Sequence, residues 1–103
     1  MLAIDALLLN DDTKIKNFLQ RAAVELGYTS HEYSSHAFSP QGLSATLILS
    51  ESHMAVHTWP EHGNAYLVIA TCGQVNEQQG AILERVVGEL LGGTIREQET
   101  RRN

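Results

Sequence analysis

Ala65-Tyr66-Leu67-Val68-Ile69-Ala70 is apolar at every position. Such a run is typical of a strand that is buried on both faces of its sheet rather than on one. We expect this strand to cover residues 64–71 and to lie inside the sheet, where both of its faces need a covering layer.

Three neighbouring segments carry the residues of further strands. They cover residues 28–38, 43–49 and 54–58 and are rich in hydroxyl, aromatic and aliphatic side chains. Turns between the strands are indicated by Pro40-Gln41-Gly42 and by Pro60-Glu61-His62-Gly63. Short connections of this kind predict antiparallel pairing.

Two segments have the periodicity of helices. Residues 13–26 and 79–91 repeat apolar side chains at intervals of three and four, so each predicts an amphipathic helix. The first follows Asn10-Asp11-Asp12, whose side chains can cap its start, and Gly27 suits its end. Two short strands complete the predicted elements, at residues 1–9 and 94–99.

These elements predict an α+β fold, a two-layer sandwich of a mainly antiparallel sheet with two helices on one face. Two helices can cover only one face of four to six strands. The apolar run at residues 65–70 therefore needs a second cover, and the simplest is a homodimer in which two sheets stack. The alternative is that the run merely occupies the centre of a twisted sheet.

Composition and charge exclude several classes of function. The 103 residues, 43% of them hydrophobic, predict a single domain over residues 1–103. Seven basic residues against twelve acidic ones give a net charge of −5, which argues against nucleic acid as a partner. The chain has one cysteine and neither a signal peptide nor an apolar run of membrane-spanning length, so we expect a cytoplasmic protein without a membrane partner.

Reactive side chains are concentrated in one run, Leu49-Ser50-Glu51-Ser52-His53-Met54-Ala55-Val56-His57-Thr58-Trp59-Pro60-Glu61. With Cys72, the run supplies hydroxyl nucleophiles, carboxylates and imidazoles within one short region. This density is hard to explain by folding alone and predicts an enzyme. A metal site made of His53, His57 and His62 is a weak alternative, because an odd step along a strand reverses the side-chain direction.

Three motifs at matching spacing resemble the pyruvoyl-dependent S-adenosylmethionine decarboxylases in their short prokaryotic form. They are Gly42-Leu43-Ser44, the run from Ser50 to Glu61, and Thr71-Cys72-Gly73. The resemblance extends more loosely from Ala3 to about Leu91. It implies decarboxylation of S-adenosylmethionine, which provides the aminopropyl donor for spermidine synthesis.

The resemblance implies that the chain cleaves itself between Glu51 and Ser52, into residues 1–51 and 52–103. Ser52 would become a pyruvoyl group at the new end of the second fragment. An α-keto amide can condense with a substrate amine and accept the electrons released when carbon dioxide leaves. The implied cofactor is therefore made from Ser52, without a metal ion or pyridoxal phosphate.

The resemblance also assigns roles to three other side chains. His57 would transfer protons during self-processing, a task that suits imidazole near neutral pH. Ser44 would assist His57, and Cys72 would reprotonate the substrate carbon after decarboxylation. Without the motifs, a lone histidine in a strand is usually structural, and a single cysteine is usually a core residue.

Substrate binding is implied for Phe38, Trp59 and Glu61. Aromatic faces suit both an adenine ring and a sulfonium cation, and a carboxylate accepts hydrogen bonds from ribose hydroxyls. The structural alternative is that Phe38 and Trp59 pack in the core and that Glu61 is only a loop carboxylate after Pro60.

Two departures from the family pattern concern the substrate more than the self-cleavage. Val68 stands where the family commonly has Asp, and Ala70 replaces a usual aromatic residue. A pyruvoyl-dependent arginine or ornithine decarboxylase on the same scaffold is therefore the first alternative. The second is an uncleaved, non-catalytic homologue that acts as a binding module.

Overall fold

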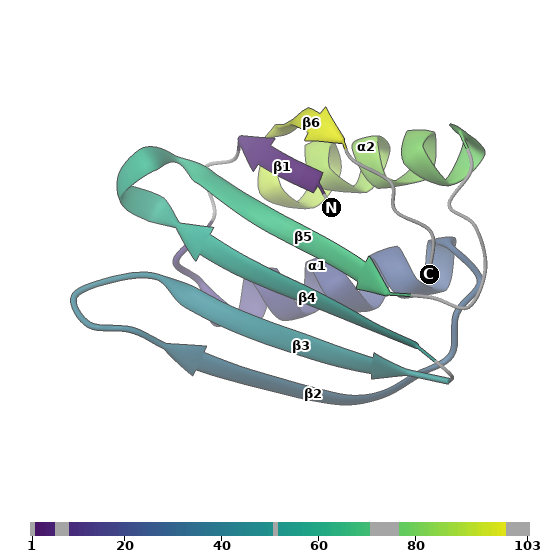
Figure 1. The fold of residues 1–103 in the computed structure, drawn as a ribbon, viewed down its shortest axis with the longest axis horizontal. Coiled ribbons are helices and arrows are strands. Elements are labelled where there is room, and N and C mark those ends of the chain that lie inside the picture. The colour runs from purple at the N-terminus through teal and green to yellow at the C-terminus, as the bar shows by residue number, and fades with distance from the viewer. Residues whose placement is uncertain (1, 6–8, 51, 71–76, 99–103) are drawn as a thin grey trace.

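A computed structural model describes residues 2–5, 9–50, 52–70 and 77–98. Within them, six strands form one sheet in the order β2-β3-β4-β5-β1-β6, and every neighbouring pair is antiparallel. The two helices lie together behind this sheet (Figure 1). The elements in chain order are β1 (Leu2–Asp5), α1 (Asp12–Glu25), β2 (Ser30–Ala37), β3 (Leu43–Leu49), β4 (Ser52–Trp59), the 3-10 helix η1 (Pro60–His62), β5 (Asn64–Ala70), α2 (Glu77–Leu91) and β6 (Thr94–Gln98).

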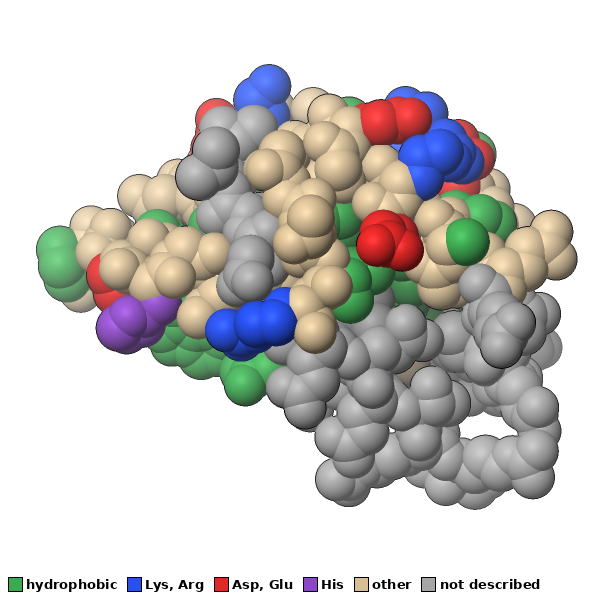
Figure 2. Space-filling view, turned by 90° about the horizontal axis from the view of Figure 1, so that it is seen from above, with side chains coloured by type: hydrophobic (Ala, Val, Ile, Leu, Met, Phe, Trp, Pro, Cys, Tyr) green, Lys and Arg blue, Asp and Glu red, His purple; other side chains and the backbone are tan. Residues whose placement is uncertain are grey.

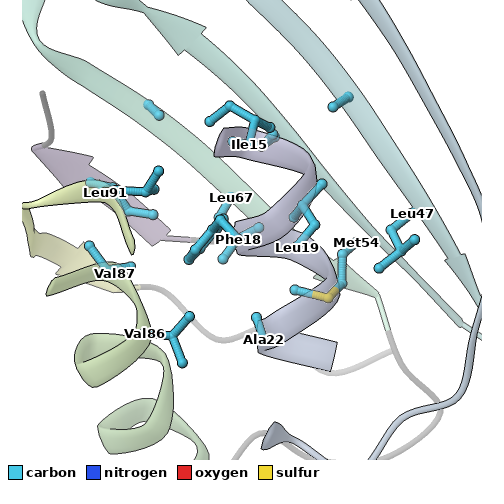
Figure 3. Close-up of a cluster of buried hydrophobic side chains, with 14 of the residues drawn as sticks. Ile15, Phe18, Leu19, Ala22, Leu47, Met54, Leu67, Val86, Val87 and Leu91 are labelled. Atoms are coloured by element: carbon cyan, nitrogen blue, oxygen red, sulfur yellow. The ribbon is translucent and has the colours of Figure 1, made fainter. Parts of the chain in front are cut away.

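The hydrophobic core lies between the helices and one face of the sheet. Phe18 and Leu19 of α1 and Val86 of α2 are completely buried there (Figure 3). Alternate residues of the central strands meet them, as a period of two requires. These strand residues include Leu47 of β3, Met54 of β4 and Leu67 of β5. The predicted α+β class, with an antiparallel sheet and two helices on one face, is thus confirmed.

Helix α1 is one residue earlier at each end than the predicted range 13–26, and it is capped by residues that the sequence indicates. The carboxylate of Asp11 accepts hydrogen bonds from the backbone N–H groups of Thr13 and Lys14, at 3.0 and 3.3 Å. At the other end, Gly27 has a φ of +82°, and the N–H of Tyr28 donates to the carbonyl of Ala23. A left-handed residue of this kind closes a helix by satisfying its last carbonyls.

An exposed network of ion pairs joins α1 to α2. Glu25 accepts from Arg21 at 3.0 Å and from Arg85 at 2.8 Å, while Glu89 pairs with Arg21 at 3.4 Å and with Arg85 at 3.6 Å. The hydrogen bond from Arg85, and then that from Arg21, holds the pKa of Glu25 below its usual value. Figure 2 shows basic and acidic side chains next to one another over the helical layer.

Several strand boundaries differ from prediction. Among the described residues the first strand covers Leu2–Asp5, and Leu9, predicted as its last residue, is not part of a strand and packs into the core. β2 begins at Ser30 rather than at residue 28, because the N–H of Tyr28 donates to the carbonyl of Ala23 at the end of α1. β4 begins at Ser52, two residues earlier than predicted, and includes Trp59.

The opposite face of the sheet has no covering layer among the described residues, and we call it the open face. Tyr66 on this face is 41% exposed, whereas Leu67, which points to the helices, is completely buried. The expected burial of residues 65–70 on both faces is therefore not met within one chain. The open face comprises Ser44, Thr46 and Ile48 of β3, His53, Ala55, His57 and Trp59 of β4, and Tyr66, Val68 and Ala70 of β5.

Neither of the helices in the described ranges has the length and hydropathy required to cross a membrane.

Candidate active site

Ser44 and His57 form a hydrogen-bonded pair on the open face. They are directly opposed residues of β3 and β4, and Ser44 Oγ lies 2.7 Å from His57 Nδ1. Either group can donate in this bond, depending on which ring nitrogen of the imidazole carries the proton. The arrangement holds the imidazole by one nitrogen and leaves the other for a reacting group.

A depression of about 310 Å³ lies beside this pair. It is formed where the β2–β3 turn meets the end of β4 and η1, and it joins all three predicted substrate-binding residues to the Ser44–His57 pair. Its lining consists of Phe38, Gln41, Gly42, Leu43, Ser44, His57, Thr58, Trp59 and Glu61. Five side chains predicted from the sequence thus surround one cavity.

The β2–β3 turn is fixed to the rest of the site by backbone hydrogen bonds. The N–H of Phe38 donates to the carbonyl of Gly42 at 2.9 Å, and the N–H of Gly42 donates to Asn10 Oδ1 at 3.0 Å. The buried hydroxyl of Thr58 accepts from the N–H of Leu43 at 2.9 Å. Gly42 has a φ of +108°, a conformation that a residue with a Cβ rarely adopts. These bonds set the position of Phe38 relative to β4.

The aromatic walls are exposed and are held by other rings. Phe38 is 51% exposed and Trp59 is 38% exposed, so neither is a core residue, and the core-packing alternative for them is wrong. The ring of His36 meets Phe38 edge-on at 4.6 Å between centroids, and Tyr66 meets Trp59 edge-on at 5.4 Å. Edge-to-face contacts of this kind restrict ring orientation without burying the faces. The walls therefore keep surface for a ligand.

Ser52 does not lie in this depression. It is the first residue of β4, half-buried, and it opposes Leu49. His57 is five positions farther along β4, which at about 3.4 Å per residue is roughly 17 Å along the strand. The two residues also point to opposite faces, because an odd step along a strand reverses the side-chain direction. His53 and His57 are four positions apart, an even step, and both point to the open face, so the expected reversal of side-chain direction between these two histidines is wrong.

Two other predicted residues, Glu51 and Cys72, lie outside the described residues. The structure consequently leaves untested the predicted scissile bond and the predicted proton donor.

Sequence reasoning missed three side chains that shape the site, those of Asn10, His36 and Tyr66. His36, Ser44, His57 and Tyr66 form a row of directly opposed residues across β2, β3, β4 and β5. His36 and Phe38 are two positions apart, a spacing that places both on one strand face and could have revealed their contact. The links from Asn10 to Gly42 and from Tyr66 to Trp59 are set by tertiary pairing and left no local signal.

The chain is similar to known proteins along its whole length. The family model described as S-adenosylmethionine decarboxylase matches residues 1–103. An S-adenosylmethionine decarboxylase proenzyme of Syntrophomonas wolfei is 49% identical over 65 residues, which are 63% of this chain and 52% of that protein. One from Geobacillus kaustophilus is 39% identical over 89 residues, which are 86% of this chain and 69% of that protein. The chain thus spans about half the length of several curated relatives that it matches.

Among solved structures, the fold is similar to that of the adenosylmethionine decarboxylase from Aquifex aeolicus VF5. The TM-score is 0.69, and the match covers 98% of this chain and 93% of that chain. Because the sequences are only 22% identical, this likeness concerns the fold alone.

Proposed function

Because the chain belongs to the S-adenosylmethionine decarboxylase family, we propose that it decarboxylates S-adenosylmethionine with a pyruvoyl group made from its own Ser52. The observation that carries the proposal is the Ser44–His57 pair at the wall of a depression lined by exposed aromatic rings and Glu61. The relatives named as proenzymes support self-processing. The product would serve as the aminopropyl donor for spermidine synthesis.

The proposed cleavage uses atoms that the chain itself provides. Ser52 Oγ attacks the carbonyl carbon of Glu51, and the amide bond is exchanged for an ester. Elimination then breaks the ester, leaving a free carboxylate on Glu51, and hydrolysis of the resulting dehydroalanine releases ammonia and leaves a ketone at residue 52. The position of Ser52 at the start of β4 fits this chemistry, because pairing with Leu49 holds the new chain end. The pyruvoyl group supplies an electron sink for decarboxylation.

The described side chains have distinct proposed tasks. His57 takes and returns protons during cleavage, and Ser44 Oγ keeps the imidazole in a fixed orientation, as the 2.7 Å contact indicates. Phe38 and Trp59 present exposed ring faces to the adenine and to the sulfonium cation. Glu61, exposed in η1, accepts hydrogen bonds from the ribose hydroxyls. We assign reprotonation of the substrate carbon to Cys72, since a thiol can donate a proton close to neutral pH.

The distance along β4 supports a homodimer in which protomers share their sites. A separation of roughly 17 Å on opposite strand faces is too large for His57 to reach Ser52 of the same chain. The open face exposes Ile48, Trp59 and Tyr66, which are 43%, 38% and 41% exposed, and a second sheet would cover them. We therefore propose that open faces stack in a two-fold dimer. The Ser52 side chain points to the helices, but the main chain at Ser52 lies in the plane of the sheet and is accessible from the open face, so we propose that the Ser44–His57 pair of one protomer serves the cleavage site at the start of its partner's β4.

An intact-mass spectrum under denaturing conditions tests the self-cleavage. We expect two fragments, residues 1–51 and 52–103, the second lighter than its sequence mass because Ser52 has lost its amine. Ser52→Ala should stay whole. A single species of 11.3 kDa after long incubation would overturn the pyruvoyl mechanism and favour the non-catalytic alternative.

Mixed dimers test the sharing of sites. Ser52→Ala and His57→Ala chains, carrying different affinity tags, are produced together and separately. The His57→Ala chain should be cleaved when the Ser52→Ala chain supplies an intact His57, and it should stay whole when produced alone. A His57→Ala chain that stays whole in the isolated mixed dimer would show that His57 acts within its own protomer.

Carbon dioxide release from three substrates tests the substrate and the effect of Cys72. We expect turnover of S-adenosylmethionine and not of arginine or ornithine, because the depression offers aromatic faces for a nucleoside. Val68, half-buried on the open face opposite Ala55, is the departure that makes the comparison necessary. Turnover of arginine or ornithine alone would reject S-adenosylmethionine. Cys72→Ala should cleave normally yet decarboxylate poorly.

A further inference from the structure

Ser50, two positions before Ser52, is held by two contacts with the start of β2. Its N–H donates to the carbonyl of Thr29 at 3.0 Å. Its hydroxyl lies 2.7 Å from His31 Nε2, so the side chains also share a hydrogen bond. Both side chains belong to exposed residues outside the depression, and neither is used in the site described above.

An irregularity of β2 directs His31 to this contact. Ser30 opposes Leu49 and Glu32 opposes Ile48, so His31 is an extra residue without an opposite in β3. A β-bulge of this kind interrupts the alternation of side chains and gives the extra residue a new direction. In a regular strand, residues 30 and 32 would share one face. Here they oppose Leu49 and Ile48, which are consecutive residues of β3 and point to opposite faces.

Residue 52 is held from a different direction. Ser52 opposes Leu49 in the pairing of β4 with β3. The residues on both sides of position 51 are therefore anchored, Ser52 by the sheet and Ser50 by Thr29 and His31. The proposed attack of the Ser52 hydroxyl on the preceding carbonyl carbon depends on how these two groups are placed relative to each other. Small displacements of reacting atoms lower the reaction rate strongly.

We propose that His31 is a positioning residue for self-cleavage: through its hydrogen bond to Ser50 it holds the segment that precedes the scissile bond. This inference rests on the proposed function, because it concerns the cleavage between Glu51 and Ser52. His31 touches neither the attacking hydroxyl nor the pocket, and it acts through Ser50.

The rate of self-cleavage in a set of variants tests this role. Both partners are exposed and water competes for them, so His31→Ala should slow cleavage by roughly tenfold, the equivalent of one hydrogen bond. Ser50→Ala should slow it similarly, and the double variant should be no slower than either single one. His31→Gln, whose amide nitrogen can occupy the place of Nε2, should restore most of the rate, whereas the shorter His31→Asn should not.

Two controls separate positioning from folding. His62→Ala removes an exposed imidazole from η1 and should cleave at the wild-type rate. In an uncleavable Ser52→Ala background, His31→Ala should unfold at nearly the same denaturant concentration as its parent. If the wild-type chain cleaves, two results would overturn this inference alone. One is an unchanged cleavage rate in His31→Ala, and the other is equal slowing by His31→Ala and His31→Gln. A wild-type chain that stays whole would overturn it together with the proposed function.

Discussion

Ser44 and His57 stand directly opposite each other in β3 and β4, and a 2.7 Å contact joins Ser44 Oγ to His57 Nδ1. Both point to the face of the sheet that the helices leave open. A shift of one residue in the register of these strands would send one of the two side chains toward the core. The pair therefore depends on the register of the β3–β4 hairpin, in which Leu49 at the end of β3 opposes Ser52 at the start of β4.

Removal of the imidazole should affect self-cleavage more than removal of its hydroxyl partner. His57→Ala is expected to slow cleavage by roughly 10²–10⁴-fold, the usual contribution of a general acid–base group. Ser44→Ala should slow it by roughly tenfold, because one hydrogen bond to the imidazole is lost. Denaturing mass spectra over time provide the rates. Ser34→Ala, an exposed hydroxyl on β2, is the matched control, and a wild-type rate in His57→Ala would contradict the assignment.

The walls of the depression should affect substrate affinity and not self-cleavage. Phe38→Leu and Trp59→Leu are each expected to raise KM by roughly fivefold, because each removes a ring face worth about 1 kcal/mol. Glu61→Gln should raise it by roughly tenfold, because a charged acceptor is lost. Carbon dioxide release as a function of substrate concentration measures the effect. Val24→Ala changes an exposed apolar residue of α1 and should leave KM unchanged.

A side chain at position 42 should change both the stability of the protein and the shape of the depression. Gly42→Ala would force a side chain into a φ of +108° and place its Cβ 3.4 Å from the carbonyl oxygen of Thr58. We expect a loss of about 1–3 kcal/mol in the free energy of unfolding and a higher KM. Urea unfolding in the Ser52→Ala background measures the first quantity.

Gly27 provides the matched control for this substitution. It also has a positive φ, +82°, but a Cβ there would meet nothing within 4 Å. Gly27→Ala should therefore lower stability by a comparable backbone term while leaving KM unchanged. Equal changes of KM in both variants would refute the specific role of Gly42.

A hydrogen bond between β2 and α1 should make stability depend on pH. Tyr33 Oη donates to Asp12 Oδ1 at 2.7 Å, and this bond is the main reason that the pKa of Asp12 is lowered. Burial, and then the same bond, raises the pKa of Tyr33. A carboxylate with a lowered folded-state pKa stabilises the fold above its unfolded pKa of about 3.9, and this stabilisation is lost as pH falls through the folded-state pKa.

Tyr33→Phe should therefore destabilise the protein by about 0.5–1 kcal/mol at pH 7, a small effect because the carboxylate is exposed. The ring that Lys16 approaches at 5.6 Å is retained in this variant. The difference between the two proteins should narrow below about pH 4 as Asp12 becomes protonated. Urea unfolding from pH 3 to 7 provides the comparison, and a constant difference over that range would contradict the coupling.

Local signals were sufficient for the elements but not for their exact ends. The apolar period of α1, Asp11 before it and Gly27 after it predicted that helix correctly, because capping and periodicity are properties of adjacent residues. Strand ends were less predictable. Leu9 looked like a continuation of the first strand, since nothing in its immediate neighbours distinguishes a core residue from a paired one.

The site was predicted as a set of residues and not as an arrangement. The resemblance to the family implied Phe38, Ser44, His57, Trp59 and Glu61, and the fold brings all five to one depression. The contacts of Asn10 with Gly42, Tyr66 with Trp59 and His31 with Ser50 could not be predicted in the same way. Each joins segments whose proximity depends on sheet register, on a turn or on a bulge.

The sequence by itself determined the secondary-structure elements, the membership in the family and the chemical groups of the site, because these follow from local periodicity and from residue identity. Only the tertiary structure decided which groups meet. Strand pairing brings Ser44 to His57 and leaves Ser52 roughly 17 Å farther along the same strand, since strand rise and alternation, rather than nearness in sequence, set the distance and direction between side chains.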